Sequence, residues 1–226
     1  MIHHHPEILQ GSDEWLALRC GVLTASEIRL IITPTLKPAR NDTSRAHLYE
    51  LLAQRITQHV EPRYVSDDML RGQADEIEAR ALYSRHFAPV SELGFITRDF
   101  GAFTIGYSPD GLVGDDGLIE CKSRRQKYQT ETLISGVVPS EHVLQCQTGL
   151  LVSGRQWLDY VSYCAGMPMA VIRVWSDETV QAAIVEAASV FEEALADRLE
   201  AYRDALSADG ARLVATERRI ETEIFA

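Results

Sequence analysis

The stretch 102–123 limits most strongly what this chain can fold into. It contains two runs of strand-forming residues, 102–113 and 118–123, joined by the turn sequence Gly-Asp-Asp-Gly at 114–117. Two such runs around a short turn that contains glycine predict a β-hairpin. A sheet is therefore expected in the middle of the chain.

Charged side chains gather on this hairpin. Side chains alternate between the two faces of a strand, so Glu120 and Lys122 point to one face while Ile119 and Cys121 point into the core. Closure of the hairpin brings Asp110, from the sequence Ser-Pro-Asp-Gly, near Glu120. Two carboxylates and one ammonium group are thus expected to converge in a small volume.

The rest of the chain shows helical spacing before the hairpin, and both helical and strand patterns after it. Helices are expected at 12–21, from residue 24 onward, and at 45–59, 67–86, 140–152 and 178–206, with a turn-rich loop at 33–43. Further strands are expected at 92–98, 157–163 and 169–175. This order predicts an α/β (α+β) fold with a central mixed sheet flanked by helices. We expect one domain over 1–226, with N-terminal helices at 12–86, a catalytic core at about 90–175, and a closing helix and tail.

The composition excludes several classes of protein. No apolar run approaches the roughly 20 residues of a membrane span, and the N-terminus does not resemble a signal peptide. The four cysteines stand apart without a Cys-x-x-Cys pair, so neither a zinc site nor a disulfide scaffold is expected. Unpaired cysteines of this kind predict a cytoplasmic location. We assign no function to the run His3–His5.

Charge argues against a general nucleic-acid binder, because 22 basic and 33 acidic residues give a net charge of −11. The chain has only three lysines, Lys37, Lys122 and Lys127, and two of them lie within six residues of each other beside Arg124 and Arg125. A nuclease remains compatible with this charge if its few cations are concentrated where DNA lies.

The residues that converge on the hairpin suit phosphodiester hydrolysis. This reaction needs hard oxygen ligands for Mg²⁺ and a group that orients the attacking water. Asp110 and Glu120 would supply ligands, with the Cys121 backbone carbonyl as a third, and Lys122 would position the water. A Ser-Pro-Asp-Gly turn and an acid-x-Lys triplet both occur by chance, but here the triplet occurs once and follows Pro-Asp at hairpin distance.

Four blocks of sequence resemble a known family. The chain is similar to phage lambda exonuclease and its viral and prophage relatives, the YqaJ-like recombinases or alkaline exonucleases, within the PD-(D/E)xK nuclease superfamily. The blocks lie at 18–27, 72–76, 108–112 together with 120–122, and 145–147. The resemblance implies a restriction-endonuclease-like core and a Mg²⁺-dependent deoxyribonuclease with two ions per site, for which Mn²⁺ would substitute.

The resemblance also implies roles for residues outside the hairpin. Glu76 would complete the metal shell, directly or through water, and Gln145 would contact the active-site water or phosphate. Arg19 and Ser26 would bind the 5′-phosphate of the digested strand. The residues themselves agree on Ser26, because Thr24 and Glu27 fit a capping box that places Ser26 in a first helical turn, where free N–H groups favour an anion.

Several other polar residues are candidates for the site. Arg124, Arg125 and Lys127 follow the catalytic strand and are candidates to contact the DNA backbone. Lys37 and Arg40 in the early loop are weaker candidates. His142 lies one helical turn before Gln145, whereas Gln147 points elsewhere and is not expected to share its role. Each of these residues has the alternative of an ordinary solvated or structural position. The residues with this alternative are Arg124, Arg125, Lys127, Lys37, Arg40, His142 and Gln147.

The function expected from these observations is digestion of one strand of duplex DNA from a 5′-phosphorylated end, leaving a 3′ single-stranded overhang for recombination. The resemblance adds a ring-shaped homotrimer and a single-strand annealing protein as partner. Three alternatives stay open: a restriction- or repair-type endonuclease of the same fold, a non-catalytic DNA-binding subunit, and a metal-dependent enzyme acting on small phosphates.

Overall fold

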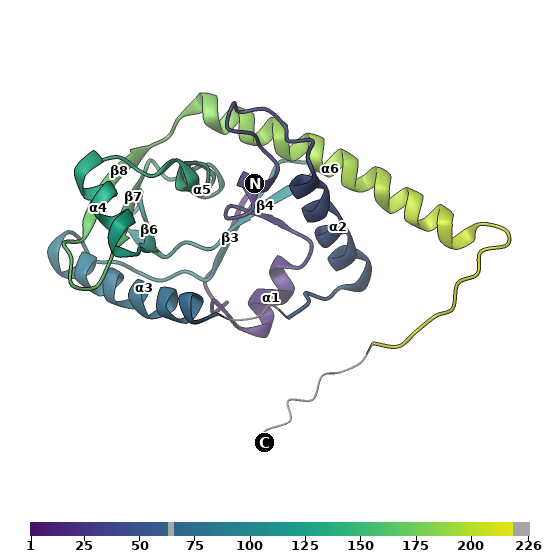
Figure 1. Ribbon diagram of the computed structural model, residues 1–226, viewed down its shortest axis with the longest axis horizontal. Coiled ribbons are helices and arrows are strands. Elements are labelled where there is room, and N and C mark those ends of the chain that lie inside the picture. The colour runs from purple at the N-terminus through teal and green to yellow at the C-terminus, as the bar shows by residue number, and fades with distance from the viewer. Residues whose placement is uncertain (63–65, 219–226) are drawn as a thin grey trace, which may run out of the picture.

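A computed structural model describes residues 1–62 and 66–218 (Figure 1). Its helices are α1 (Asp13–Arg19), the 3₁₀ helix η1 (Ile28–Leu30), α2 (Asp42–Thr57), α3 (Asp67–His86), α4 (Gln126–Ser135), α5 (Ser140–Ser153) and α6 (Glu178–Ser207). Its strands are β1 (Ile2–His5), β2 (Leu23–Thr24), β3 (Phe95–Asp99), β4 (Thr104–Tyr107), β5 (Gly111–Val113), β6 (Gly117–Ser123), β7 (Trp157–Tyr163) and β8 (Ala170–Trp175). The end of the expected tail, 219–226, lies outside the described residues.

The strands form two mixed sheets rather than the one central sheet expected from the sequence. The first has the order β1-β3-β4-β2, and the second has the order β5-β6-β7-β8. In each sheet one neighbouring pair is parallel and the other pairs are antiparallel. The expected class, mixed α and β with helices around mixed sheets, is confirmed. The division arises where the chain leaves β4 at Tyr107 and starts β5 at Gly111.

The expected hairpin forms the heart of the second sheet. Strand β5 pairs antiparallel with β6, with Gly111 opposite Ile119, and β6 pairs parallel with β7. The two faces of β6 differ as its alternation predicted. Ile119 and Cys121 pack with residues of α3, while Leu118 packs with residues of α5 and α6 in the main core.

Helices α5 and α6 enclose the main hydrophobic core. The buried side chains of α6 recur at helical spacing and include Ile184, Ala188, Phe191 and Leu195. Beyond Leu195 the helix has no buried residue and projects from the body of the molecule (Figure 1). Among the described residues, the helices lack the apolar length that a membrane span requires.

Truncation of Ile184 tests how far α6 holds the fold together. This side chain is fully buried in the main core. Ile184→Ala should lower the free energy of unfolding by about 2–5 kcal/mol, because it removes buried methyl groups and leaves a cavity. Urea denaturation is the measurement, with the exposed neighbour Glu186→Ala as control. Equal effects of the two substitutions would contradict the packing described here.

Two local expectations were wrong or incomplete. The helix expected from Thr24 does not form. Thr24 ends the short strand β2, and only the three-residue η1 follows. The run His3–His5 belongs to the strand β1, which pairs antiparallel with β3. The ring of His5 makes a hydrogen bond with the Thr97 hydroxyl at 3.1 Å, so this run is part of the fold.

The capping signals elsewhere worked as sequence rules predict. The Ser12 hydroxyl accepts a hydrogen bond from the Trp15 N–H at the start of α1, and Asn41 accepts one from the Ser44 N–H at the start of α2. The latter helix starts three residues before the expected position 45, because Asn41 supplies the cap. All four cysteines are unpaired, as expected.

Candidate active site

Asp110 lies on the link between the two sheets, directly before β5. Its side chain is 9% exposed. Carboxylate Oδ2 accepts a hydrogen bond from the Cys121 N–H at 2.6 Å, which fixes the carboxylate against β6. The Arg80 guanidinium donates to the Asp110 carbonyl at 3.0 Å and so ties the same link to α3.

Glu120 is the centre of the polar network, although it is only 1% exposed. Its Oε1 accepts from the Lys122 ammonium at 2.6 Å and from the Gln145 amide, which α5 supplies. Its Oε2 accepts from the Tyr107 hydroxyl at 2.9 Å. The structure therefore brings together Glu120, Lys122 and Gln145, and it holds Asp110 beside them through the N–H of Cys121, the residue after Glu120.

Negative charge exceeds positive charge in this buried cluster. Burial raises the pKa of Asp110 well above its usual value, and the nearby Glu120 carboxylate raises it further. Burial alone would lower the pKa of Lys122, but Glu120 and Asp110 outweigh it and hold that pKa above its usual value. Lys122 is thus a cation that offsets only part of the charge of the two carboxylates, so the site favours an added cation.

Glu76 borders the same cluster from α3. Burial raises its pKa, Arg80 lowers it, and Glu120 raises it. Its Oε1 lies 3.9 Å from the Arg80 guanidinium, which also holds the Asp110 carbonyl. The neighbouring Asp75 instead accepts a hydrogen bond from the Ser123 hydroxyl, whereas Glu76 lies close enough to Glu120 for that carboxylate to raise its pKa.

A complete side-chain metal cage is not assembled. Within 1–62 and 66–218, no three His, Cys, Asp or Glu side chains are grouped closely enough to hold an ion by themselves. The donor set is nevertheless of the hard-oxygen type, because two buried carboxylates lie beside the backbone of β6. Asp110 and Glu120 fit a divalent cation that also uses backbone or water oxygens.

Arg19 and Ser26 lie around Thr24, close to the Asp110 link. The Arg19 guanidinium lies 3.3 Å from the Ser108 hydroxyl and 3.5 Å from the Thr24 hydroxyl, which is itself 3.3 Å from the Ser26 hydroxyl. Arg19 also stacks on the Trp15 ring, 4.3 Å from its centroid. The two residues expected to bind a phosphate are therefore near each other.

The α-helix that was expected to hold Ser26 in its first turn does not form. Ser26 is exposed and precedes a single 3₁₀ turn, not an α-helix, so no helix dipole favours an anion there. The capping contact itself exists, since Glu27 accepts hydrogen bonds from both the N–H and the hydroxyl of Thr24. An anion at this position would depend on the Arg19 charge and on hydroxyl groups.

The basic residues after β6 point in different directions. Arg124 contacts Glu141 and His142 on α5. Arg125 is 63% exposed and pairs with Asp68 at 2.7 Å. The Lys127 ammonium lies over the Tyr128 ring. The structure places only Arg124 against the helix that carries Gln145.

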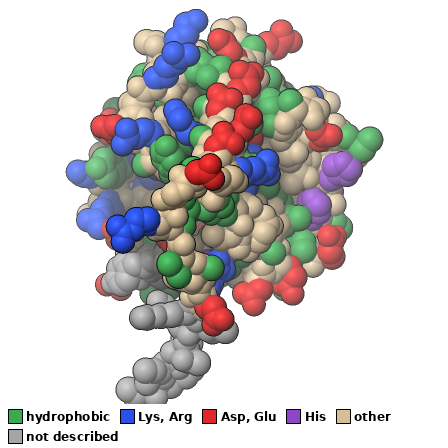
Figure 2. Space-filling model, turned by 90° about the vertical axis from the view of Figure 1, so that its right-hand side faces the viewer, with side chains coloured by type: hydrophobic (Ala, Val, Ile, Leu, Met, Phe, Trp, Pro, Cys, Tyr) green, Lys and Arg blue, Asp and Glu red, His purple; other side chains and the backbone are tan. Residues whose placement is uncertain are grey.

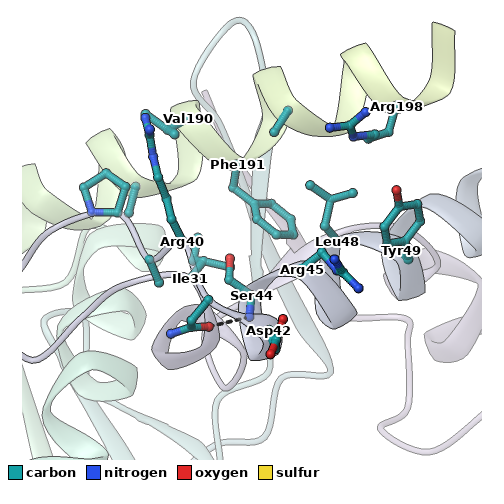
Figure 3. Close-up of a pocket in the computed structure, with 15 residues that line it drawn as sticks. Ile31, Arg40, Asp42, Ser44, Arg45, Leu48, Tyr49, Val190, Phe191 and Arg198 are labelled. Atoms are coloured by element: carbon teal, nitrogen blue, oxygen red, sulfur yellow. Dashed lines mark hydrogen bonds between the residues drawn. The ribbon is translucent and has the colours of Figure 1, made fainter. Parts of the chain in front are cut away.

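The early loop leads to a separate cavity of about 650 Å³ between α2 and α6. Arg40 lines it together with Arg45 and Arg198, over apolar side chains that include Leu48 and Phe191 (Figure 3). None of the hairpin residues lines this cavity. Lys37 is exposed in the loop, which is closed by the pairing of Ile32 with Pro38.

Basic and acidic side chains are unevenly spread on the face from which α6 projects. Acidic side chains run across the middle of this face, and basic ones gather toward its left (Figure 2). The net charge of −11 therefore does not exclude local basic surface.

Two residues of the network were missed from the sequence. Tyr107 donates to Glu120, and Arg80 connects Glu76 with Asp110. Arg80 lies four residues after Glu76 on one helix, and this spacing was a usable signal. Gln147 turns away from the site, as expected, and binds the Trp175 carbonyl and the Asp177 N–H.

Comparisons with known proteins agree on one family. Residues 14–156 match the model of the YqaJ-like viral recombinase domain. The structure is similar to an alkaline exonuclease (LHK-Exo) from Laribacter hongkongensis, at 32% identity and a TM-score of 0.78, covering 87% of this chain and 98% of that one. The same enzyme in complex with dAMP gives 32% identity and a TM-score of 0.77, with coverage of 87% and 98%.

A more distant structure shares the fold. A phage-related exonuclease from Haemophilus somnus 129PT is 12% identical, with a TM-score of 0.61 and coverage of 80% of this chain and 96% of that one. A search of curated proteins found no match. The matched region holds Arg19, Asp110, Glu120, Lys122 and Gln145. By its sequence from 14 to 156 and by its structure, the chain belongs to the YqaJ-like viral recombinase family.

Proposed function

We propose that the protein is a Mg²⁺-dependent 5′–3′ exonuclease that digests one strand of duplex DNA and leaves a 3′ single-stranded overhang. Its family and its likeness to an alkaline exonuclease make it a deoxyribonuclease of the lambda exonuclease type. The observation that carries the finer proposal is the 2.6 Å contact of Lys122 with the buried Glu120 carboxylate, beside a second buried carboxylate, Asp110.

Mg²⁺ is the cofactor that the donor set supports. Asp110 and Glu120 would hold it together with the Cys121 carbonyl, and Glu76 would complete the shell directly or through water. We propose two ions per site, with Mn²⁺ as a substitute. When bound, such ions polarise the phosphate and lower the pKa of water. The excess of buried carboxylate charge favours a bound cation at this site. The hard oxygen ligands favour Mg²⁺ and Mn²⁺ in particular.

The protein's own groups divide the remaining work. The Lys122 ammonium orients the attacking water and offsets charge that develops on the phosphate oxygens. The Gln145 amide donates to Glu120 in the free protein. In the complex with DNA it would donate to the water or the phosphate. Tyr107 fixes the Glu120 carboxylate and Arg80 fixes the Asp110 link, so both act as positioning residues.

The end of the DNA is the proposed source of strand polarity. Arg19 and Ser26 would bind the terminal 5′-phosphate, with the next phosphodiester over Asp110. The contact of Arg19 with Ser108, two residues before Asp110, supports this arrangement. The homotrimeric ring, the single-strand annealing partner and the cytoplasmic location follow from resemblance and composition, and they stay predictions.

Removal of divalent metal should abolish digestion. Linear duplex DNA should be degraded in Mg²⁺ or Mn²⁺, left intact after chelation, and bound but barely cut in Ca²⁺, because Ca²⁺ prefers a looser coordination. Gel analysis of linear and covalently closed circular DNA measures both metal need and end requirement. Activity that survives chelation would rule out the mechanism, and ready nicking of circles would favour the endonuclease alternative.

A further inference from the structure

A second polar cluster adjoins Lys122, on the side where α5 covers the second sheet. Arg124 lies at its centre and is 11% exposed. Both terminal nitrogens of its guanidinium lie 3.3 Å from Oε1 of Glu141, and one of them also lies 2.9 Å from Nε2 of His142. The His142 ring stacks on Tyr160 at a centroid distance of 5.5 Å. Tyr160 pairs in register with Glu120, so the cluster sits beside the catalytic strand.

Two polar atoms of this cluster lack a hydrogen-bond partner. Within the described chain, the Arg124 Nε and the Tyr160 hydroxyl are buried and unpaired. Tyr160 is fully buried, and Arg124 is nearly so. Buried donors in folded proteins are almost always satisfied. The chain therefore leaves part of the hydrogen-bonding capacity of the Arg124 guanidinium unused.

The contacts of Arg124 also show which of its two partners, Glu141 or His142, a ligand can replace. His142 must accept from Arg124 at Nε2, because a guanidinium has no acceptor, and this leaves its proton on Nδ1. Burial, followed by the charges of Lys122 and Arg124, lowers the pKa of His142 to about 4, so the ring is neutral at pH 7. Glu141, by contrast, is 54% exposed, and such surface ion pairs are weak.

We infer that Arg124, held by His142, whose ring stacks on the buried Tyr160, forms a binding site for an internal phosphodiester of the DNA backbone, and that this phosphate displaces the Glu141 carboxylate. The inference rests on the proposed function in one respect, which is that DNA is the substrate. Phosphate oxygens match the planar fork of arginine, whose two terminal nitrogens share a single Glu141 oxygen in the free protein. His142 is a positioning residue that holds the guanidinium in place.

The test measures DNA binding without turnover. Fluorescence anisotropy of a labelled duplex is recorded in EDTA at increasing KCl for wild type, Arg124→Ala and Arg124→Lys. Arg124→Ala should weaken binding about tenfold and reduce the slope of log affinity against log salt by about 0.9, because one phosphate contact is lost. Arg124→Lys should keep the slope and lose part of the affinity, because its charge remains but its fork does not. Arg203→Ala, an exposed arginine on the projecting part of α6, is the charge-matched control.

Glu141→Gln supplies a result that a structural role would not give. It should tighten DNA binding by up to about fivefold, because it removes the competing carboxylate, and this gain should vanish in the Arg124→Ala background. Glu131→Gln, an exposed acid on the neighbouring helix α4, controls for the change in overall charge. A gain that persists without Arg124 would overturn the displacement of Glu141.

Duplexes with different 5′ ends distinguish an internal phosphodiester from a terminal 5′-phosphate as the ligand of Arg124. An internal phosphodiester predicts the same loss in Arg124→Ala for duplexes with 5′-phosphate and 5′-hydroxyl ends. A loss confined to 5′-phosphorylated duplex, or an unchanged salt slope in folded Arg124→Ala, would overturn the assignment. None of these readouts depends on cleavage, so a failure of the exonuclease proposal is recognised separately, by intact linear DNA in Mg²⁺.

Discussion

Lys122→Met, Glu120→Gln and Asp110→Asn should each reduce the rate of DNA digestion by about three orders of magnitude or more. Each substitution keeps the size of the side chain and removes one charge from the cluster in which Lys122 and Glu120 touch at 2.6 Å. Steady-state rates on 5′-phosphorylated linear duplex measure the effect. Double substitutions should add little, because groups that act in one transition state are not additive.

The same variants separate catalysis from folding. Asp110→Asn should keep or raise Tm, because it removes a carboxyl group that is buried beside Glu120 and whose pKa is therefore raised. Tyr107→Phe is the matched control for loss of one contact to Glu120, and it should cost far less activity than Glu120→Gln. A folded Lys122→Met variant with rates like those of wild type would show that this hairpin is not the catalytic centre.

A linear duplex with a 5′-phosphate should be digested about ten to a hundred times faster than the same duplex with a 5′-hydroxyl end, because charge-assisted contacts of this kind contribute about 1.5–3 kcal/mol. Arg19 and Ser26 lie within one connected set of hydroxyl and guanidinium contacts beside Ser108. In Arg19→Ala this ratio should fall towards one, because the variant loses the charge that recognises the end. Quenched time courses with the two substrates give the ratio directly.

Arg19→Ala should leave the metal requirement unchanged, because Arg19 is not one of the proposed metal ligands. Its companion, Ser26→Ala, should lower the ratio less, because it removes a hydroxyl and no charge. Rates that are equal for the two ends in the wild-type protein would contradict the exonuclease proposal. Release of mononucleotides from the 5′ end is the expected product pattern.

The sequence located the hairpin and most helices because turns, strand alternation and helix caps depend on residues that are close together in the chain. The alternation along β6 placed Glu120 and Lys122 on the face opposite Ile119 and Cys121. The helix expected from Thr24 failed for a physical reason: a capping box satisfies N–H groups but does not drive propagation. Ile31, Ile32 and Thr33 are β-branched and precede a proline, so the chain leaves the helical conformation after one turn.

Long-range pairing could not be predicted in the same way. Three consecutive histidines show no strand alternation, and β1 exists only because β3 pairs with it. The contact between Arg19 and Ser108 joins residues 89 positions apart, and only the fold determines it. Family resemblance supplied Arg19, Ser26 and Gln145 as site residues, which the residues alone could not single out.

The link at Ser108–Asp110 is also the connection between the two sheets. Tyr107, on the last residue of β4, donates to Glu120 on β6, so one sheet holds a carboxylate of the other. The hydrogen bond that positions the catalytic carboxylate thus also joins the two sheets. A packing change in the first sheet that moves Tyr107 would therefore shift the Glu120 carboxylate and alter the chemistry without touching any reacting group.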